Sequence, residues 1–380
     1  MRNLLYLILF LPLLSIAQSY NIGHTTVTFI DDTRARSVVT EIYYPSDETG
    51  EDVAASNGSY PVIVFGHGFL IGWESYSNFW SELVPNGYIL CFPTTEMGLS
   101  PDHEALGEDL KFVAEKMHEF DYDSSSIFFN SIMPKTAIMG HSMGGGASFL
   151  SSSFNTSINT LINFAAAETT PSAILAATNV NIPTLIFSGE DDCVAPALTN
   201  QVPMYDALNS SRKTLISIKN GGHCYFANDN FACNFGESFC NSELNIDREQ
   251  QQNVTFDFLN LWLDYTLYNY EYALDEFNDS LQSSIRINFQ QLWESVGINQ
   301  DLELERFKIF PNPVIDKLNI DLPQDNCNGY YSISTVFGQI VQQNEIQNCS
   351  SSVNVSYLPK GVYLFKYSNQ DRLQSTLFIK

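Results

Sequence analysis

The feature that most constrains this chain is a regular alternation of β-rich runs and helical stretches between Tyr20 and about Asn269. The later runs are almost continuously apolar, which is typical of parallel strands covered by helices on both faces of a sheet. We therefore predict a doubly wound, mostly parallel α/β sheet over residues 18–269. The expected strands read TTVTF, SVVTEIYY, YPVIVFGHG, GYILCFP, TAIMG, TLINFAA, IPTLIFSG and TLISIKNGG, and the clearest helices read HEALGEDLKFVAEKMHEF and NVTFDFLNLWLDYTL.

Two further regions follow this sheet. Residues 270–303 are polar with scattered aromatics, and they predict a helical linker. From residue 304 to residue 380, runs such as FKIFPNPVIDKLNIDL and VNVSYLPKGVYLFKYS alternate apolar and polar residues with a period of two. Pro, Gly and Asn separate these runs, so we expect a small antiparallel β-sandwich as a second domain.

The first 17 residues read as a signal peptide. Arg2 supplies a positive charge, residues 4–14 form an apolar run, and Ser15-Ile16-Ala17 offers a small-residue cleavage site. The run is too short to span a bilayer. No later stretch approaches 18 uninterrupted apolar residues, so we expect an exported protein without stable membrane insertion.

The charge balance excludes one class of partner. The chain has 43 acidic and 18 basic residues, a formal net charge of −25. Nucleic-acid binding rests on Lys and Arg neutralising phosphates, so we expect no nucleic-acid partner. No cluster of His, Cys and carboxylate residues has metal-ligand spacing, so neither a metal nor another cofactor is expected. We expect a monomer.

A glycine-rich segment, GHSMGGG at residues 140–146, directly follows the apolar stretch KTAIM. Its first five residues fit G-x-S-x-G, the sharp strand-to-helix turn that presents a nucleophilic serine above a sheet. A phosphate-binding loop is the poorer interpretation, because no Lys-Ser/Thr pair follows the glycines. Ser142 is therefore the candidate nucleophile. Gly145 and Gly146 predict close packing of the following helix on the sheet.

A serine hydrolase on such a sheet needs a histidine base and an acid, in the chain order serine, acid, histidine. Only His223, in KNGGHCYF, lies downstream of the motif, and it follows a predicted strand. His223 is therefore the candidate base, whereas His67 and His141 are interpreted as structural hydrogen-bonding residues. The remaining histidines, His24, His103 and His118, all precede the motif.

Five carboxylic acids lie between the candidate nucleophile and base. Asp206 falls in a predicted helix, MYDALN, where a surface position is expected. Glu168 follows TLINFAAA and stays open as an alternative acid. Glu190, Asp191 and Asp192 follow IPTLIFSG, at the correct end of the strand before the histidine loop. We select Asp192 for its G-x-x-D-x-x-x-P context.

The same topology predicts an oxyanion hole. One donor is the backbone N–H after the nucleophile, Met143, and the other comes from an earlier strand-to-loop turn. Residues 66–69, GHGF, follow the strand PVIVF, so the second donor is the N–H of Phe69. Losing one such donor typically lowers the rate by about a hundredfold or more. The Phe69 side chain is expected at the mouth of the site and in contact with substrate.

An exported chain can oxidise its cysteines. Cys193 follows the proposed acid and Cys224 the proposed base, so a disulfide between them is expected, contributing about 3–4 kcal/mol in the chain-entropy model. The strand-like GYILCF predicts a buried free thiol for Cys91. The other four cysteines form two pairs close in sequence, but six cysteines allow about 15 connectivities, so these pairings stay open. They are Cys233 with Cys240 and Cys327 with Cys349.

Four segments, GHSMGGGAS, IPTLIF, DDCVAP and NGGH, resemble the dienelactone hydrolase-like α/β-hydrolases. They are most similar to bacterial cutinases and polyester hydrolases, including those that act on poly(ethylene terephthalate), over roughly residues 20–270. The resemblance implies a lidless esterase, with Ser142, Asp192 and His223 as its triad. It also implies Phe69 and Met143 as oxyanion donors, and in some of those enzymes a disulfide lies near the acid and base.

One loop departs from this resemblance. Polyester hydrolases usually carry a substrate-stacking tryptophan after the strand that corresponds to TLINFAAA, whereas residues 167–173 here read AETTPSA. Only about fifteen residues separate this strand from IPTLIFSG, too few for a lid domain. An open, shallow cleft suits a bulky or polymeric ester better than a small metabolite.

The C-terminal FKIFPNPVIDKLNI and KGVYLFKY resemble the sorting domain of the type IX secretion system of Bacteroidetes. This resemblance implies the secretion machinery as a partner and a location outside the cell or on its surface. A carbohydrate-binding β-sandwich is the alternative.

The sequence thus predicts a secreted serine ester hydrolase that cleaves polymeric or bulky esters through an acyl-enzyme. Two other functions stay open: a carboxylesterase of short soluble acyl esters, and a surface-displayed, non-catalytic binding protein.

Overall fold

The computed structural model describes residues 19–153, 157–240, 244–293, 308–322, 329–335, 340–368 and 373–380. The chain divides into two compact units, residues 1–294 and residues 295–380, and each is described by itself. The predicted signal peptide, the later part of the predicted linker and Cys327 lie outside the described residues.

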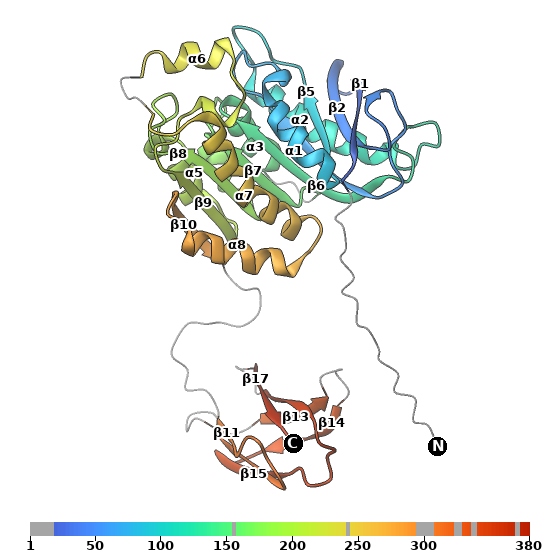
Figure 1. The fold of residues 1–380 in the computed structure, drawn as a ribbon, viewed down its shortest axis with the longest axis vertical. Coiled ribbons are helices and arrows are strands. Elements are labelled where there is room, and N and C mark those ends of the chain that lie inside the picture. Colours follow the sequence, from blue (N-terminus) through green and yellow to red (C-terminus); the bar gives the residue numbers. More distant parts are fainter. Residues whose placement is uncertain are drawn as a thin grey trace, which may run out of the picture. The chain divides into compact units, whose positions relative to one another are not determined.

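The first unit is built on one ten-stranded sheet (Figure 1). Strands β5, β4, β6, β7, β8 and β9 run parallel, while β1, β2 and β10 join the two ends of the sheet in antiparallel pairs. This confirms the doubly wound, mostly parallel architecture and all eight predicted strands. In spatial order the strands are β10 (Ile287–Trp293), β9 (Arg212–Ile218), β8 (Thr184–Gly189), β7 (Thr160–Phe164), β6 (Ile132–His141), β4 (Tyr60–Gly66), β5 (Ile89–Pro93), β2 (Arg36–Ser46), β1 (Asn21–Asp31) and β3 (Gly50–Glu51).

Helices cover both faces of this sheet, because the central strands are apolar on both sides (Figure 1). Along β4, Ile63 and Phe65 enter one buried cluster, while Val62 and Val64 enter the other. On the first face lie α1 (Ser77–Leu83), α7 (Arg248–Thr266) and α8 (Glu271–Ser283). On the second lie α2 (His103–Phe120), α3 (Met143–Ser152), α4 (Ala173–Ala177) and α5 (Gln201–Ala207).

The shorter helical turns sit in the connections. They are η1 (Trp73–Tyr76), η2 (Val84–Asn86), η3 (Ala197–Thr199), η4 (Cys224–Phe226) and the seven-residue helix α6 (Phe231–Glu237). Helix α2 has the predicted bounds, and α7 begins five residues before the predicted segment because Asp247 and Gln250 form a capping box. No helix among the described residues is long and apolar enough to cross a membrane.

The segment predicted as a helical linker differs from that expectation. Its helix, α8, packs on the sheet through the buried residues Ala273, Phe277 and Leu281, which recur every fourth position. Its next residues form β10, which pairs with the whole of β9 in antiparallel register. The period-two pattern of INFQQLW, with Ile287 buried, accounts for this edge strand. Residues 271–293 therefore belong to the first unit.

The second unit has two small antiparallel sheets, which confirms the predicted β-sandwich. One sheet contains β11 (Lys308–Phe310), β12 (Lys317–Asp321) and β15 (Ser350–Asn354). The other contains β14 (Ile340–Ile346), β13 (Gly329–Thr335), β16 (Val362–Ser368) and β17 (Leu373–Ile379). Both contribute to one buried cluster that includes Leu318, Ile333 and Phe365.

Candidate active site

Ser142 occupies a strained turn between β6 and α3. Its backbone has φ 55° and ψ −120°, values that residues other than glycine rarely adopt. Three hydrogen bonds hold this conformation: the Ser142 N–H donates to the Phe164 carbonyl at 3.0 Å, and the Ser142 carbonyl accepts from Gly146 at 3.1 Å and from Ala167 at 2.9 Å. The segment thus forms the sharp strand-to-helix turn that the sequence predicts, an elbow with Ser142 at its tip.

The glycines around the serine allow this turn to pack closely. A Cβ atom at Gly140 would collide with the Gly144 carbonyl, and one at Gly144 would collide with the Gly66 carbonyl. A Cβ at Gly145 would lie 2.8 Å from Ala166, and one at Gly146 would collide with the carbonyl of the next residue in that loop. The interpretation of the last two glycines as packing residues is therefore confirmed.

The structure brings the three predicted triad residues together. His223 Nε2 lies 2.9 Å from Ser142 Oγ, and His223 Nδ1 lies 2.8 Å from Asp192 Oδ2. The Asp192 side chain is fully buried, and its Oδ1 accepts the N–H groups of Val194 at 2.9 Å and Ala195 at 2.8 Å. A carboxylate held in this way accepts a hydrogen bond from the N–H at Nδ1. The proton then stays on Nδ1, and the lone pair of Nε2 points at the serine hydroxyl.

Two of the other candidate acids make their hydrogen bonds away from His223. Glu168 accepts the N–H of Ile174 at 3.1 Å, and Glu190 accepts the N–H of Asn220 at 3.1 Å. Asp206 is exposed on α5, as predicted. The geometry therefore favours Asp192 over the alternative acid Glu168.

The two predicted oxyanion donors sit in suitable backbone positions. Met143 is the first residue of α3, so its N–H has no acceptor within the helix. Phe69 follows β4 in a turn, where Leu70 has a positive φ of 55°. The neighbouring Gly68 N–H is already used, since it donates to the Tyr76 hydroxyl at 2.8 Å. The Phe69 side chain is 43% exposed, in keeping with a place at the mouth of the site.

A buried tyrosine–histidine pair, which the sequence did not reveal, links the oxyanion loop to the base loop through hydrogen bonds. The Tyr76 hydroxyl lies 3.0 Å from His141 Nδ1, and His141 Nε2 lies 3.0 Å from the His223 carbonyl. Burial lowers the pKa of His141 well below its ordinary value and raises the pKa of Tyr76. His141 is therefore neutral: Tyr76 donates to Nδ1, and Nε2–H donates to the carbonyl. His141 is confirmed as a structural hydrogen-bonding residue.

The residues on either side of His223 are held by two further polar side chains. Gln251 of α7 is fully buried, and its amide makes two hydrogen bonds of 2.9 Å with the N–H and carbonyl of Gly222. Glu237 of α6 accepts the N–H of Cys224 at 2.7 Å. No motif marks either residue. The one available signal is a glutamine at a position where the helical pattern of α7 requires an inward-facing side chain.

Two disulfide bonds flank the site, and their pairing corrects the prediction. Cys193, next to the acid, bonds to Cys240, and Cys224, next to the base, bonds to Cys233. The expected Cys193–Cys224 bond is wrong, and so is the pairing of Cys233 with Cys240, because each loop cysteine bonds to a cysteine in α6 or directly after it. Helix α6 carries Cys233 to the base loop, and the residues after it carry Cys240 to the acid loop.

Three cysteines take no part in these two bonds. Cys91 on β5 is a buried free thiol, as predicted, and burial raises its pKa. Cys349 in the second unit is disulfide-bonded, and Cys327 lies outside the described residues.

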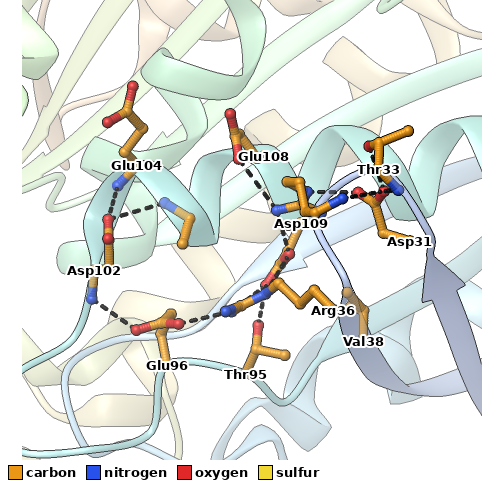
Figure 2. A network of polar contacts seen from close by, with 12 residues as sticks. Asp31, Thr33, Arg36, Val38, Thr95, Glu96, Asp102, Glu104, Glu108 and Asp109 are labelled. Atoms are coloured by element: carbon orange, nitrogen blue, oxygen red, sulfur yellow. Dashed lines mark hydrogen bonds and ion pairs between the residues drawn. The ribbon is translucent and has the colours of Figure 1, made fainter.

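A network of ion pairs is centred on Asp109 (Figure 2), and Thr95 connects it to His67 of the oxyanion loop. His67 Nε2 donates to the Thr95 carbonyl at 2.7 Å, which confirms its structural role, and the Thr95 hydroxyl donates to Asp109 Oδ2 at 2.6 Å. Asp109 on α2 is fully buried. Its carboxylate accepts hydrogen bonds from Arg36 Nε at 2.9 Å and Arg36 Nη2 at 2.6 Å, and it forms an ion pair with Arg34 Nη1 at 2.8 Å. The hydrogen bond to Asp109 raises the pKa of Arg36.

The connection over the site is short. Between β7 and β8 the chain forms only α4, a helix of five residues, so the first unit is lidless there. Within the part of the chain that the structure describes, no group of three or more His, Cys, Asp or Glu side chains is placed to hold a metal ion.

The first unit is similar to known proteins. Residues 26–241 match the family described as PET hydrolase-like. Cutinase 1 of Thermobifida cellulosilytica is 28% identical over 172 residues, 45% of this chain and 59% of that protein. Cutinase est1 of Thermobifida alba is 27% identical over 186 residues, 48% of this chain and 56% of that protein. The chain thus spans little more than half the length of these curated relatives.

The second unit has a match of its own. Residues 308–380 match the secretion system C-terminal sorting domain, so this is a secreted or cell-surface protein. The first match covers more than half of the 380 residues, and its region contains the elbow, the acid and the base. The chain therefore belongs to the PET hydrolase-like family of α/β-hydrolases.

Proposed function

We propose that this protein is a serine ester hydrolase that works through an acyl-enzyme. The observation that carries the proposal is the chain of hydrogen bonds from the buried Asp192 through His223 to Ser142, ending on a strained elbow. Such an arrangement activates a hydroxyl that is otherwise a weak nucleophile at neutral pH.

In the first half of the reaction, Ser142 Oγ attacks the ester carbonyl carbon while His223 Nε2 takes the hydroxyl proton. The buried Asp192 carboxylate stabilises the imidazolium. The N–H groups of Phe69 and Met143 hold the oxyanion. The carbon–oxygen bond to the alcohol then breaks, and His223 protonates the departing alkoxide.

In the second half, water attacks the acyl-enzyme carbonyl and His223 takes a proton from that water. Collapse of this second tetrahedral intermediate breaks the bond to Ser142 Oγ, which regains its proton from His223. The products are one alcohol and one carboxylic acid for each ester cleaved, and the enzyme returns to its starting state.

We propose polymeric or bulky esters, polyesters among them, as the substrates. The short connection at α4, the exposed Phe69 ring and membership of a PET hydrolase-like family support this class. The relatives named cutinases point the same way. A carboxylesterase of short soluble esters is the second candidate, because residues 167–173 offer no aromatic side chain for an aromatic polymer to stack on.

We also propose that the type IX secretion machinery is the partner that recognises residues 304–380. The match of the second unit to a secretion sorting domain supports this.

The test compares the full chain with its Ser142→Ala variant on p-nitrophenyl butyrate and on amorphous poly(ethylene terephthalate) film. We expect the variant to lose activity by about 10⁴-fold or more on every ester that the wild type cleaves. A fluorophosphonate probe should label the wild type and leave the variant unlabelled. Equal activity in the variant, or an unlabelled wild type, would overturn the proposal in favour of a binding protein. Turnover of the soluble ester without release from film would favour the second candidate.

A further inference from the structure

Three phenylalanines project from α6 and the residue pair after it into solvent. Phe231, Phe235 and Phe239 recur every fourth residue and are 84%, 57% and 72% exposed. Their rings form a row, with centroid separations of 6.2 Å for the first pair and 5.2 Å for the second. Exposed large apolar groups that gather in one place usually mark an interaction site. We call these three residues the phenylalanine row.

The row is fixed to the catalytic loops by covalent bonds. Cys233, between the first two phenylalanines, is buried and bonds to the residue after His223. Cys240, next to the third phenylalanine, bonds to the residue after Asp192. Because the cysteine at the centre of α6 is buried while Phe231 and Phe235 are exposed, the two disulfides hold the helix with its aromatic side facing out.

The exposed face of α6 is uncharged, although the chain as a whole carries a formal charge of −25. Glu237 is the one charged residue between positions 230 and 240, and its carboxylate accepts the N–H of Cys224. The residues of this segment that are exposed beside the row are neutral, such as Asn234 and Ser238. Asp229, just before the helix, accepts a hydrogen bond from Asn234 at 2.8 Å, and its charge is paired with Arg248 at 3.6 Å. Such a face matches an uncharged, apolar or aromatic partner.

The row continues into apolar side chains of the acid loop. A Cβ atom on Gly236 of α6 would lie 3.9 Å from Val194 Cγ2, so the helix is in contact with this loop. Val194 is 43% exposed and Leu198, a few residues further on, is 81% exposed. An exposed apolar side chain of the loop that carries Asp192 therefore lies beside the helix that carries the phenylalanine row.

We propose that the phenylalanine row binds the units of a polyester chain that lie beyond the ester being cleaved at Ser142. This inference rests on the proposed function. A polymer cannot end at the catalytic serine, so its next units must lie on a neighbouring surface, and this surface is apolar, uncharged and rigidly joined to the acid and base. Phenyl rings add a stacking contribution with aromatic units beyond the area they bury.

The test uses the full chain with Phe231, Phe235 and Phe239 all changed to serine. Adsorption to poly(ethylene terephthalate) film is measured with a quartz crystal microbalance, with Ser142→Ala present in every protein so that the film is not consumed. We expect adsorption at low protein concentration to fall by about tenfold or more, because the variant lacks the three phenyl rings that would be buried against the film. When Ser142 is kept, the row variant should release products from the film more slowly by a similar factor. Its turnover of p-nitrophenyl butyrate should change by less than about twofold, because the substitutions lie outside the triad.

A matched control changes Tyr122, Ile127 and Phe129 to serine. These residues are 83%, 36% and 43% exposed and precede β6, whereas Ser142 follows it, so they lie at the opposite end of that strand. We expect this control to adsorb like the protein that carries Ser142→Ala alone. Retained turnover of the soluble ester shows that each variant is folded.

Three outcomes would overturn the inference. If the row variant adsorbs and releases product as the wild type does, only the inference fails. If the wild type hydrolyses the soluble ester but releases nothing from film, the proposed polyester activity fails and the inference fails with it. If size-exclusion chromatography finds a wild-type dimer that the row variant abolishes, the row is a contact between two copies of this chain.

Discussion

The two sides of the candidate active site are held by different kinds of bond. On the side of β4 and the oxyanion loop that follows it, Arg36 and Thr95 hydrogen-bond to the buried carboxylate of Asp109 (Figure 2). On the opposite side, the loops that carry the acid and the base are tied by the Cys193–Cys240 and Cys224–Cys233 disulfides. One side is therefore sensitive to charge, and the other is sensitive to reduction.

The difference follows from how much apolar surface each element buries. Helix α2 packs on the sheet through a row of fully buried residues that includes Leu106, Leu110 and Val113. Helix α6 buries Cys233 and presents its large apolar side chains to solvent. A seven-residue helix with so little buried surface is not stable through packing alone, so covalent bonds supply what packing does not.

The largest effect is expected from removing the Cys193–Cys240 bond. It closes a loop of sequence separation 47, and the chain-entropy model assigns such a loop about 4 kcal/mol of stability. The double variant Cys193→Ser/Cys240→Ser should therefore unfold in urea with a free energy lower by roughly that amount. The Cys224→Ser/Cys233→Ser variant, with a separation of 9, should lose less, about 2.7 kcal/mol.

Mild reduction of the native protein provides the matching control. Cys193 is exposed, whereas Cys224 and Cys233 are both buried, so a reductant should reach the first bond before the second. Mass spectrometry after alkylation should show modified Cys193 and Cys240 while the other pair is intact. Equal stability of both double variants and the wild type would mean that α6 is held by packing after all.

The next effect concerns the charged side. Changing Asp109 to Asn leaves two arginines, Arg34 and Arg36, without their buried partner, and breaking such a pair costs about 3 kcal/mol. The free energy of unfolding in urea measures this loss. The control is Asp257→Asn, which removes an Arg–Asp pair with Arg286 whose side chains are about half exposed.

Exposed pairs contribute about 0–1 kcal/mol, so the control should unfold almost as the wild type does. Similar losses in both variants would show that burial adds nothing to the Asp109 network. The contrast between the two sides of the site would then rest on the disulfides alone.

Features that obey local rules could be predicted from the sequence. The elbow around Ser142, the strands and the helix over residues 103–120 follow from apolar periodicity and a short motif. The choice of His223 needed only the chain order of the triad residues and the small number of histidines. These features depend on neighbours in the sequence or on the topology of the sheet.

Features that depend on distant packing were missed. The disulfide pairing depends on where α6 lies, and nothing in FACNFGESFC indicates that its two cysteines bond to different loops. Tyr76 and Gln251 reach the site from elements 65 and 29 residues away in sequence from their partners, so no spacing pattern connects them to it. The edge strand β10 was missed because the run INFQQLW is short and three of its seven residues are polar.

The smallest expected effect is a pH dependence at the link between the two sides, where His141 joins Tyr76 to the base loop. Burial lowers the pKa of His141 in the folded state below the ordinary value of 6.5. Below pH 6.5 the unfolded chain therefore binds a proton that the folded chain does not, and stability falls with decreasing pH. The slope for one such histidine is about 1.4 kcal/mol per pH unit, and this contribution is fully present above pH 6.5.

Urea unfolding of the wild type and His141→Gln between pH 7.5 and pH 5.5 measures this slope. We expect the variant to lose less stability across that range, although the half-buried His118, whose pKa is also lowered by burial, leaves a residual slope of the same sign in both proteins. Asp31, whose pKa is lowered by its hydrogen bonds to Thr33 and Arg34, contributes only at more acidic pH. If the two slopes are equal, the link transmits no charge effect, and the two sides of the site respond to pH and to reductant independently.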